Sequence, residues 1–212
     1  MTGLNNEARA RRFVVAYPDG FGKSWNAGGV CCGEANSQHV DDVAFIRTLM
    51  DRLNKMYPID SARVFVTGFS NGAMMAYRLA CEMSDRVAAI VSVSGTLRIE
   101  DCHPARPVSI WEMHGTADSI VPYEGDPSSL STASVVQRWV TLDGCSTAPI
   151  PSNKGITKTS TWNNCRQGTT VRLDTVTAGH HTWFGSYMDP VPDEPGASSV
   201  IAAFFGDLRA RG

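Results

Sequence analysis

The architecture of this chain follows from residues 63–73, which read Arg63-Val-Phe-Val-Thr-Gly-Phe-Ser-Asn-Gly-Ala73. The β-branched and aromatic residues at 64–67 predict a strand that ends at Gly68, and an apolar helical pattern follows the turn. A Gly-x-Ser-x-Gly sequence between a strand and a helix is typical of a nucleophile elbow, in which the serine is held on a strained bend. We expect Gly68 and Gly72 to leave room where strand and helix cross, and we predict that Ser70 is a nucleophile.

Length and composition favour one globular domain spanning residues 1–212. Hydrophobic residues make up 42% of the 212 positions, which is enough apolar content for a sizeable core. The formal net charge of −2 gives no electrostatic reason to expect a nucleic acid or an anionic membrane surface as a partner. No apolar run approaches the roughly 20 residues that span a bilayer, so we expect no membrane association.

Six cysteines are many for a cytosolic enzyme and indicate disulfides formed in an oxidising compartment, either extracellular or periplasmic. The sequence contains no Cys-x-x-Cys pair, so we expect no metal site. Residues 1–12 lack the apolar core of a signal peptide. Either a signal was removed upstream, or the sequence is not the whole gene product.

Predicted strands and helices alternate along the chain. The expected strands are 13–17, 64–67, 87–93, 107–113 and 170–177, with a further short strand at 157–162 inside a polar stretch. The expected helices are 4–12, 41–56, 71–83, 128–142 and 197–208. This order predicts an α/β fold with a mostly parallel sheet covered by helices on both faces. Ligands of such sheets bind at the carboxyl ends of the strands, where Ser70 lies.

Asp41 and Asp42 open the helix that runs to position 56. Acidic side chains are favoured at a helix N-terminus by its dipole and by its free N–H groups. A catalytic role is the alternative for these two residues, but we expect the structural one.

A serine hydroxyl needs a base to take its proton and a third group to orient that base. Asp118 lies in the loop after the predicted strand 107–113, where a carboxylate is well placed to hold an imidazole. The alternative is that Asp118 only caps a turn. Glu112 lies inside the strand and Asp126 farther along the loop, so both are poorer candidates for the acid.

Two adjacent histidines, His180 and His181, follow the last predicted strand and are candidates for the base. Neighbouring side chains point in different directions, so only one of them can meet Ser70, and the residues themselves leave the choice open. The poorer candidates are His39, His103 and His114, of which we expect the last to be structural.

Five motifs occur in a fixed order along the chain. They are Trp25-Asn-Ala-Gly-Gly-Val-Cys-Cys-Gly33, Asp41-Asp-Val-Ala-Phe-Ile46, Gly68-Phe-Ser-Asn-Gly-Ala-Met-Met75, His114-Gly-Thr-Ala-Asp118 with Val121-Pro-Tyr123, and Gly179-His-His-Thr-Trp183. Together they resemble the esterase family that contains polyhydroxybutyrate depolymerases and the feruloyl and acetylxylan esterases. The resemblance covers nearly all of the chain and implies an α/β-hydrolase fold.

The resemblance also implies a catalytic triad. The family's serine falls on Ser70 and its acid on Asp118, and alignment of the family's tryptophan onto Trp183 places the base on His181. The chain departs from the family at His180, where a glycine is usual, and at Phe184, where a proline is usual. Members of the family are commonly secreted and disulfide-bonded, and we expect Cys145 and Cys165 to pair.

A larger departure lies at the beginning of the chain. Family members carry an earlier strand that ends in His-Gly, lies beside the nucleophile strand and supplies one N–H of the oxyanion hole. We expect this strand to be absent here, which makes the hydrolase fold N-terminally shortened and leaves the Asn71 N–H as the visible oxyanion donor. Loss of one such donor typically lowers the rate by about 10²–10³.

Three outcomes are open for the place of that strand. The strand beginning at Phe13 moves beside the nucleophile strand, or a second subunit fills the gap, or the sequence is a truncated gene product. Unpaired N–H and C=O groups on a strand edge are a template for another chain. We therefore expect self-association into a homo-oligomer through this region.

The motifs and the resemblance imply a serine carboxylesterase that needs no cofactor. Its substrates would be short-chain or aryl esters, feruloyl-polysaccharides or polyhydroxyalkanoates. Trp25 and Trp183 are candidates for lining the substrate cleft, although tryptophan is commonly a core residue. Two other hypotheses remain: a non-catalytic homologue that binds an ester or polysaccharide, and a serine peptidase of the same fold.

Overall fold

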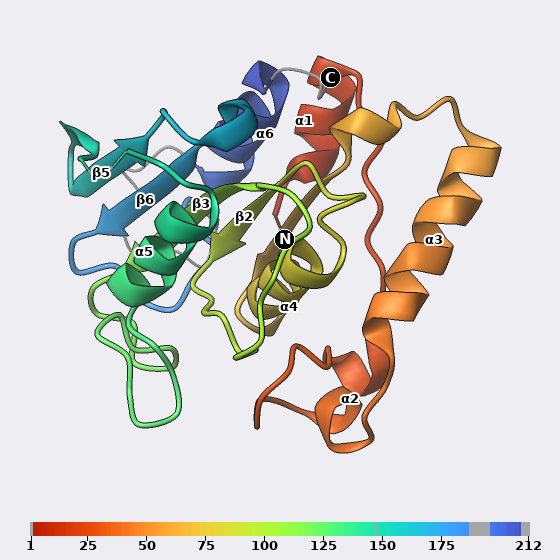
Figure 1. The fold of residues 1–212 in the computed structure, drawn as a ribbon, viewed down its shortest axis with the longest axis horizontal. Helices are drawn as coiled ribbons and strands as arrows, with labels where there is room; N and C mark the ends of the chain where they lie inside the picture. Colours follow the sequence, from red (N-terminus) through yellow and green to blue (C-terminus); the bar gives the residue numbers. More distant parts are fainter. Residues whose placement is uncertain (1, 147, 187–195, 209–212) are drawn as a thin grey trace.

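The computed structural model describes residues 2–146, 148–186 and 196–208 (Figure 1). Its helices are α1 (Leu4–Arg11), α2 (Glu34–Ser37), α3 (Asp42–Met56), α4 (Asn71–Glu82), α5 (Thr132–Leu142) and α6 (Ala197–Asp207). Its strands are β1 (Phe65–Phe69), β2 (Ala89–Val93), β3 (Ser109–Gly115), β4 (Ile150–Lys154), β5 (Thr157–Trp162) and β6 (Val171–Val176). Most predicted elements are therefore confirmed, with shifted ends.

The strands form one sheet in the order β1-β2-β3-β6-β5-β4. The first four strands of this order are parallel, whereas β5 and β4 run antiparallel. The carboxyl ends of β1, β3 and β6 therefore meet at one edge of the sheet. The prediction of an α/β fold with a mostly parallel sheet is confirmed.

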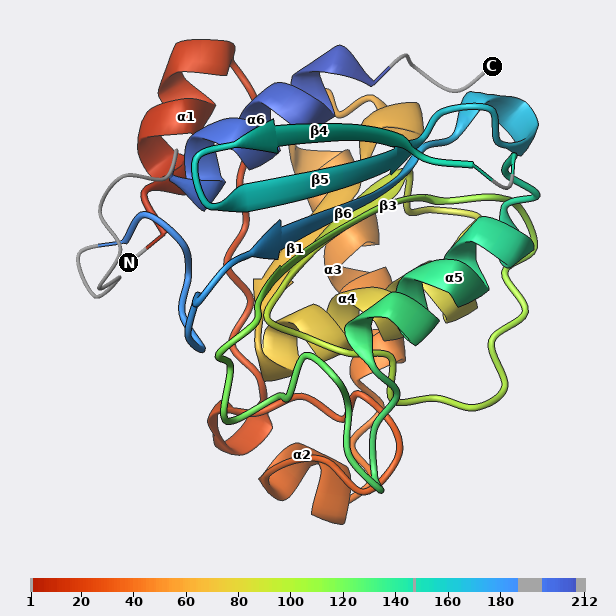
Figure 2. The same ribbon diagram turned by 90° about the vertical axis from the view of Figure 1, so that its left-hand side faces the viewer.

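Helices cover both faces of the sheet (Figure 2). α4 and α5 lie on one face, with α3 beyond α4 on the side away from α5 (Figure 1), while α6 lies on the other face, packed against α1. Successive residues of a strand point to opposite faces. Accordingly, Ile110 joins the core that contains Tyr77 and Trp139, and its neighbour Trp111 joins the core that contains Ile201.

The prediction of a strand at residues 13–17 is wrong. This segment leaves α1 as irregular chain, and Phe13, Val14 and Tyr17 are 38%, 56% and 55% exposed. A strand needs a ladder partner, and within the described residues β1 pairs only with β2. The first of the three outcomes therefore does not occur, and the outer edge of β1 is left without a strand.

β4 was not predicted because its five residues are all exposed and carry no apolar face. Its backbone pairs with β5 across a turn at Gly155, which has a φ of 56°. The short strand expected at 157–162 is confirmed as β5.

Three disulfides join the six cysteines: Cys31–Cys32, Cys81–Cys102 and Cys145–Cys165. The expected pairing of Cys145 with Cys165 is confirmed, and it ties the end of α5 to the segment before β6. Across the described ranges no helix has the length and apolar content to cross a membrane.

Candidate active site

Ser70 lies on a strained bend between β1 and α4, with φ 55° and ψ −120°. Its N–H donates to the Val93 carbonyl oxygen at 3.0 Å, which fixes the bend to the end of β2. A Cβ on Gly68 would lie 2.3 Å from the Gly72 carbonyl group, so the glycine at 68 is needed for close approach. The same expectation for Gly72 is wrong, because a Cβ there would meet open space. The elbow thus requires one glycine rather than two.

His181 lies between the serine and an aspartate. Its Nε2 is 2.9 Å from Ser70 Oγ, and its Nδ1 is 2.8 Å from Asp118 Oδ2. The imidazole packs at 4.7 Å from the ring of Phe69, and 14% of the His181 side chain is exposed. The structure therefore brings Ser70, His181 and Asp118 together, whereas the neighbouring His180 is exposed.

The loops that carry the acid and the histidine are joined by their backbones. The Ala117 N–H donates to the Gly179 carbonyl oxygen at 2.9 Å, and the Ala178 N–H donates to Thr116 Oγ1 at 2.8 Å. A Cβ on Gly115 would lie 2.1 Å from that same Gly179 oxygen. Because only a glycine permits this approach, the motif His114-Gly-Thr-Ala-Asp118 determines where His181 can lie.

The Asp118 carboxylate is saturated with donors. Oδ1 accepts from the Ile120 and Val121 N–H groups at 2.9 and 2.8 Å, while Oδ2 faces His181 and lies 3.3 Å from His114 Nε2. Burial raises the pKa of the Asp118 carboxyl, but the hydrogen bonds from His114, His181 and the loop N–H groups outweigh it and hold that pKa well below its usual range. Asp118 is therefore ionised at neutral pH.

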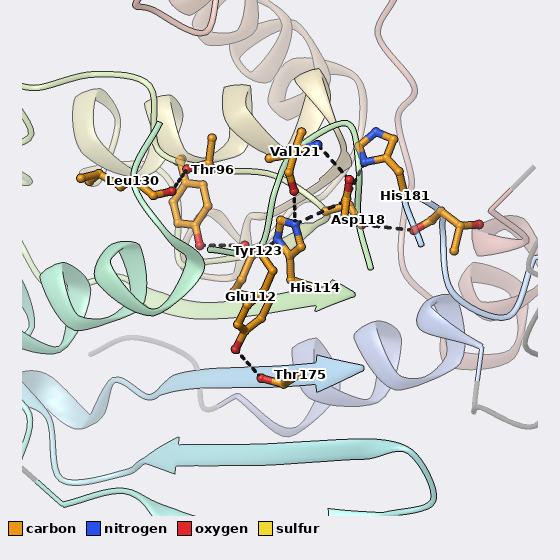
Figure 3. A network of polar contacts seen from close by, with 12 residues as sticks. Thr96, Glu112, His114, Asp118, Val121, Tyr123, Leu130, Thr175 and His181 are labelled. Carbon is orange, nitrogen blue, oxygen red and sulfur yellow. Dashed lines mark hydrogen bonds and ion pairs between the residues drawn. The ribbon is translucent and has the colours of Figure 1, made fainter. Parts of the chain in front are cut away.

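His114 and Glu112 form a buried pair behind Asp118 (Figure 3). His114 Nδ1 is 2.8 Å from Glu112 Oε1, and the Tyr77 hydroxyl donates to Glu112 Oε2 at 2.8 Å. Sequence reasoning treated His114 as structural and Glu112 as a poor acid. A Glu-x-His spacing on one strand was the available signal, since residues two apart share a face.

Asn71, the residue expected to supply an oxyanion donor, is the first residue of α4. A helix leaves its first N–H groups without intrahelical partners, so the Asn71 N–H is available beside Ser70. The Asn71 side chain holds a neighbouring loop: its Oδ1 accepts from the Trp25 N–H at 2.7 Å, and its Nδ2 donates to the Trp25 carbonyl oxygen at 3.0 Å. The half-buried Trp25 thereby lies next to the elbow.

Trp183 occupies a different place from Trp25. It is 8% exposed within the core under α6, and its indole N–H donates to Ser198 Oγ at 3.0 Å. The structure therefore places Trp183 in the core rather than on an open surface. A core position is common for a tryptophan.

Asp41 caps α3, since its side chain accepts from the Ala44 N–H, so the structural expectation is confirmed. Asp42 has a further contact that sequence reasoning missed. It is 2% exposed, and its Oδ2 accepts from the Asn26 N–H at 2.6 Å. Arg78 of α4 donates to the Asn26 carbonyl oxygen at 2.6 Å. The loop at 25–33 is thus held by two helices, by Asp42 of α3 and by Asn71 and Arg78 of α4.

Other acidic and histidine residues lie elsewhere. Asp126 accepts from Ser128 within an exposed turn, and His103 pairs with Asp101 on the surface. Among the described residues, no group of three or more His, Cys, Asp or Glu side chains is arranged to hold a metal ion.

Comparison with known proteins supports this reading of the fold. Residues 36–142 match the model of the phospholipase/carboxylesterase family. An acetyl xylan esterase from Aspergillus awamori superposes with a TM-score of 0.55 at 18% identity, over 86% of this chain and 71% of that chain, which shows a shared fold.

Two curated relatives resemble the chain in sequence. Feruloyl esterase B of Piromyces equi is 30% identical over 186 residues, covering 79% of this chain and 33% of that protein. The putative esterase NocK of Nocardia uniformis subsp. tsuyamanensis is 31% identical over 224 residues, covering 93% and 64%. The chain thus spans one third to two thirds of the length of these relatives. The resemblance inferred from the motifs is confirmed, and the family model spans half of the chain. The chain belongs to the phospholipase/carboxylesterase family.

Proposed function

We propose that the chain is a serine carboxylesterase with Ser70 as nucleophile, His181 as base and Asp118 as the orienting acid. The observation that carries the proposal is the position of His181, which lies within hydrogen-bonding distance of both Ser70 Oγ and Asp118 Oδ2. A base that contacts a nucleophile and is itself oriented by a carboxylate is the arrangement that activates a serine hydroxyl.

The reaction proceeds in two halves. Ser70 Oγ attacks the ester carbonyl carbon while its proton passes to His181 Nε2, and the tetrahedral intermediate expels the alcohol, which takes that proton. Water then attacks the acyl-serine, gives its proton to His181, and releases the carboxylic acid as the serine is reprotonated. Asp118 stays ionised and stabilises the imidazolium formed in each half. The Asn71 N–H donates to the developing oxyanion.

The substrate class we propose is an aryl or polymer-linked ester. Support comes from the relatives named feruloyl esterase and putative esterase, and from the half-buried indole of Trp25 beside the elbow. Polyhydroxyalkanoates and small aryl esters belong to the same proposal, with p-nitrophenyl acetate as the permissive test substrate. Trp183, the other candidate for the cleft, is 8% exposed and packs in the core under α6. The disulfides support an extracellular or periplasmic location for a domain formed by residues 1–212.

Replacement of Ser70 by Ala tests the proposal. The variant should lose hydrolysis of p-nitrophenyl acetate and labelling by a fluorophosphonate, with an unchanged circular dichroism spectrum. Ser131→Ala is a matched control at a half-buried serine that caps α5, and it should keep both activities. Retained hydrolysis in Ser70→Ala would show that Ser70 is not the nucleophile.

A second function, ligand binding without turnover, is favoured by one observation. Within the described part of the chain β1 pairs only with β2, so no strand on its outer edge faces the Asn71 N–H with a second oxyanion donor. A protein that binds a feruloylated oligosaccharide but is not labelled by a fluorophosphonate would have this function. Amide hydrolysis faster than ester hydrolysis would instead support a peptidase.

A further inference from the structure

Asp118 lies between two imidazole rings (Figure 3). One belongs to His181, which the proposed reaction uses, and the other to His114, which it does not. The His114 side chain is 1% exposed, as is that of its partner Glu112. Two ionisable groups with so little access to water are costly to bury, unless they interact strongly with their surroundings.

Each ring nitrogen of His114 faces oxygen atoms. Nδ1 is 2.8 Å from Glu112 Oε1, and Nε2 is 2.8 Å from the Val121 carbonyl oxygen and 3.3 Å from Asp118 Oδ2. A carbonyl oxygen only accepts hydrogen bonds, so Nε2 carries a proton, and a second proton on Nδ1, toward Glu112, makes the ring an imidazolium. Burial lowers the pKa of His114, but the hydrogen bonds to Asp118 and Glu112 outweigh it and raise the pKa to about 10.

The pair is anchored to the helix that begins behind the nucleophile. The Tyr77 hydroxyl donates to Glu112 Oε2 at 2.8 Å, and Tyr77 is fully buried in α4. Contacts therefore run without interruption from Ser70 through His181, Asp118, His114 and Glu112, and return through Tyr77 to the helix of the elbow.

We propose that Glu112 and His114 form a positioning pair, which holds the Asp118 carboxylate toward His181 and places a fixed positive charge behind it. The proposal rests on the function proposed above, because it assigns a task to residues outside the triad. Val121 supports the same pair. Its N–H donates to Asp118 Oδ1 and its carbonyl oxygen accepts from His114, so both backbone groups of Val121 hold the loop that carries Asp118.

The positive charge has an electrostatic consequence for the base. His114 and His181 contact the same Asp118 oxygen, at 3.3 and 2.8 Å, so they compete for its negative charge. A like charge nearby disfavours a second positive charge, so the charge on His114 opposes a positive charge on the imidazole of His181. The titratable groups facing the pair are Asp118, Tyr123, whose ring meets His114 edge-on at 5.9 Å, and Tyr77 from α4.

The test measures the pKa of His181 by NMR of its imidazole in a Ser70→Ala background, which does not depend on turnover. His114→Gln keeps a donor toward Val121 and Asp118 but removes the charge, and it should raise the His181 pKa by about one unit. His114→Asn also removes the charge and serves if His114→Gln does not fold. In the parent protein both His114 ring nitrogens should be protonated at pH 8.

Tyr123→Phe is the matched control. It removes a hydrogen bond to Thr175 Oγ1 of 2.7 Å in the same region and should leave the His181 pKa unchanged. With Ser70 restored, His114→Gln should lower kcat toward p-nitrophenyl acetate by about tenfold to a hundredfold with little change in KM, since a small misplacement of a catalytic group has that effect. The acid limb of its kcat/KM profile should move to higher pH.

Two results have different meanings. Failure of wild-type Ser70 to react with a fluorophosphonate would overturn the proposed function, whatever the NMR measurement gives. An unchanged or lowered His181 pKa in both His114→Gln and His114→Asn, when the protein with Ser70 intact is labelled normally, would overturn the positioning pair alone. A neutral His114 at pH 8 would do the same.

Discussion

The side chain of Asn71 is hydrogen-bonded at both ends to the backbone of Trp25, at 2.7 Å to its N–H and at 3.0 Å to its carbonyl oxygen. Residues 46 positions apart are thus joined at the base of the elbow. The contact uses the side chain of Asn71 and leaves its N–H free for the oxyanion. One residue therefore has two tasks that mutation can separate.

Asn71→Ala should destabilise the fold by about 1–3 kcal/mol, because it leaves two partly buried backbone groups of Trp25 unpaired. The backbone N–H is retained, so the fold-decrease in kcat should be smaller than the fold-increase in KM. Urea denaturation and steady-state kinetics measure the two effects. Ser37→Ala, at an exposed serine in α2, is the control and should change stability by less than about 0.5 kcal/mol. A large loss of kcat with unchanged KM would contradict this division of tasks.

Gly68→Ala and Gly72→Ala should change the free energy of unfolding in opposite directions, although the two glycines are symmetric in the motif. At position 68 the new methyl group would lie 2.3 Å from the backbone of residue 72, and we expect a loss of more than about 3 kcal/mol. At position 72 it meets nothing within 4 Å and lies in a helix, where alanine is favoured over glycine by up to about 1 kcal/mol. Thermal denaturation compares them. Equal losses would show that Gly72 is constrained as well.

The stability of the fold should fall as pH rises from 7 to 10. His114 has a folded pKa of about 10, above the value of about 6.5 in an unfolded chain, so its contribution is complete below the lower value and is lost as pH passes the upper one. The slope for one proton is about 1.4 kcal/mol per pH unit. Chemical denaturation at several pH values should show this slope in the wild type and a shallower one in His114→Gln. If the unfolding free energies of wild type and His114→Gln changed in parallel with pH, His114 would not be the group that loses its proton between pH 7 and 10.

Asp118→Asn should remove stability at neutral pH but much less in acid. The folded pKa of Asp118 is below that of an unfolded carboxyl, so its contribution is present above about pH 4 and is lost as pH falls through the folded value. The unfolding free energies of wild type and variant should therefore converge as the pH is lowered. Asp126→Asn, in an exposed turn, serves as the comparison. A constant difference between Asp118→Asn and wild type would contradict the depressed pKa.

The open edge of β1 should make the protein self-associate, as the sequence predicted. Light scattering at micromolar concentration should report a dimer or larger species, and Val14→Lys, at an exposed residue of the segment after α1, should weaken it. Ile150→Lys changes an exposed residue of β4 at the opposite edge of the sheet and should have no effect. A monomer, or dissociation only in the Ile150→Lys variant, would count against this interface.

The parts of the fold that the sequence predicted are those in which pattern and packing agree. The alternating order of elements, the elbow and the helix at Asp41 follow from periodicity and capping, and each has local causes. The failures have non-local causes. Residues 13–17 have the composition of a strand but no ladder partner, while β4 has no apolar face and is held only by its backbone pairing with β5.

The candidate site also has residues that could be predicted from the sequence and contacts that could not. Ser70 and Asp118 could be named because each follows a strand whose carboxyl end must lie at one edge of the sheet, whereas the choice of His181 over His180 came from the family resemblance. The chain order of the motifs did not reveal the Glu112–His114 pair or the contact of Asp42 with Asn26, because both depend on which side chains meet across elements. Gly72 shows the reverse: it stands in the motif, yet the space beside it is open.

The position of β1 at the end of the sheet has a consequence for thermal inactivation. Ser70 is carried by this terminal strand, whereas Asp118 and His181 follow the interior strands β3 and β6. Local opening costs least where backbone groups are exposed and few elements pack, so amide exchange should be faster along the outer side of β1 than in β3. On heating, the nucleophile should separate from an acid–base pair that is still in place. Activity would then disappear at a temperature at which the rest of the protein remains folded.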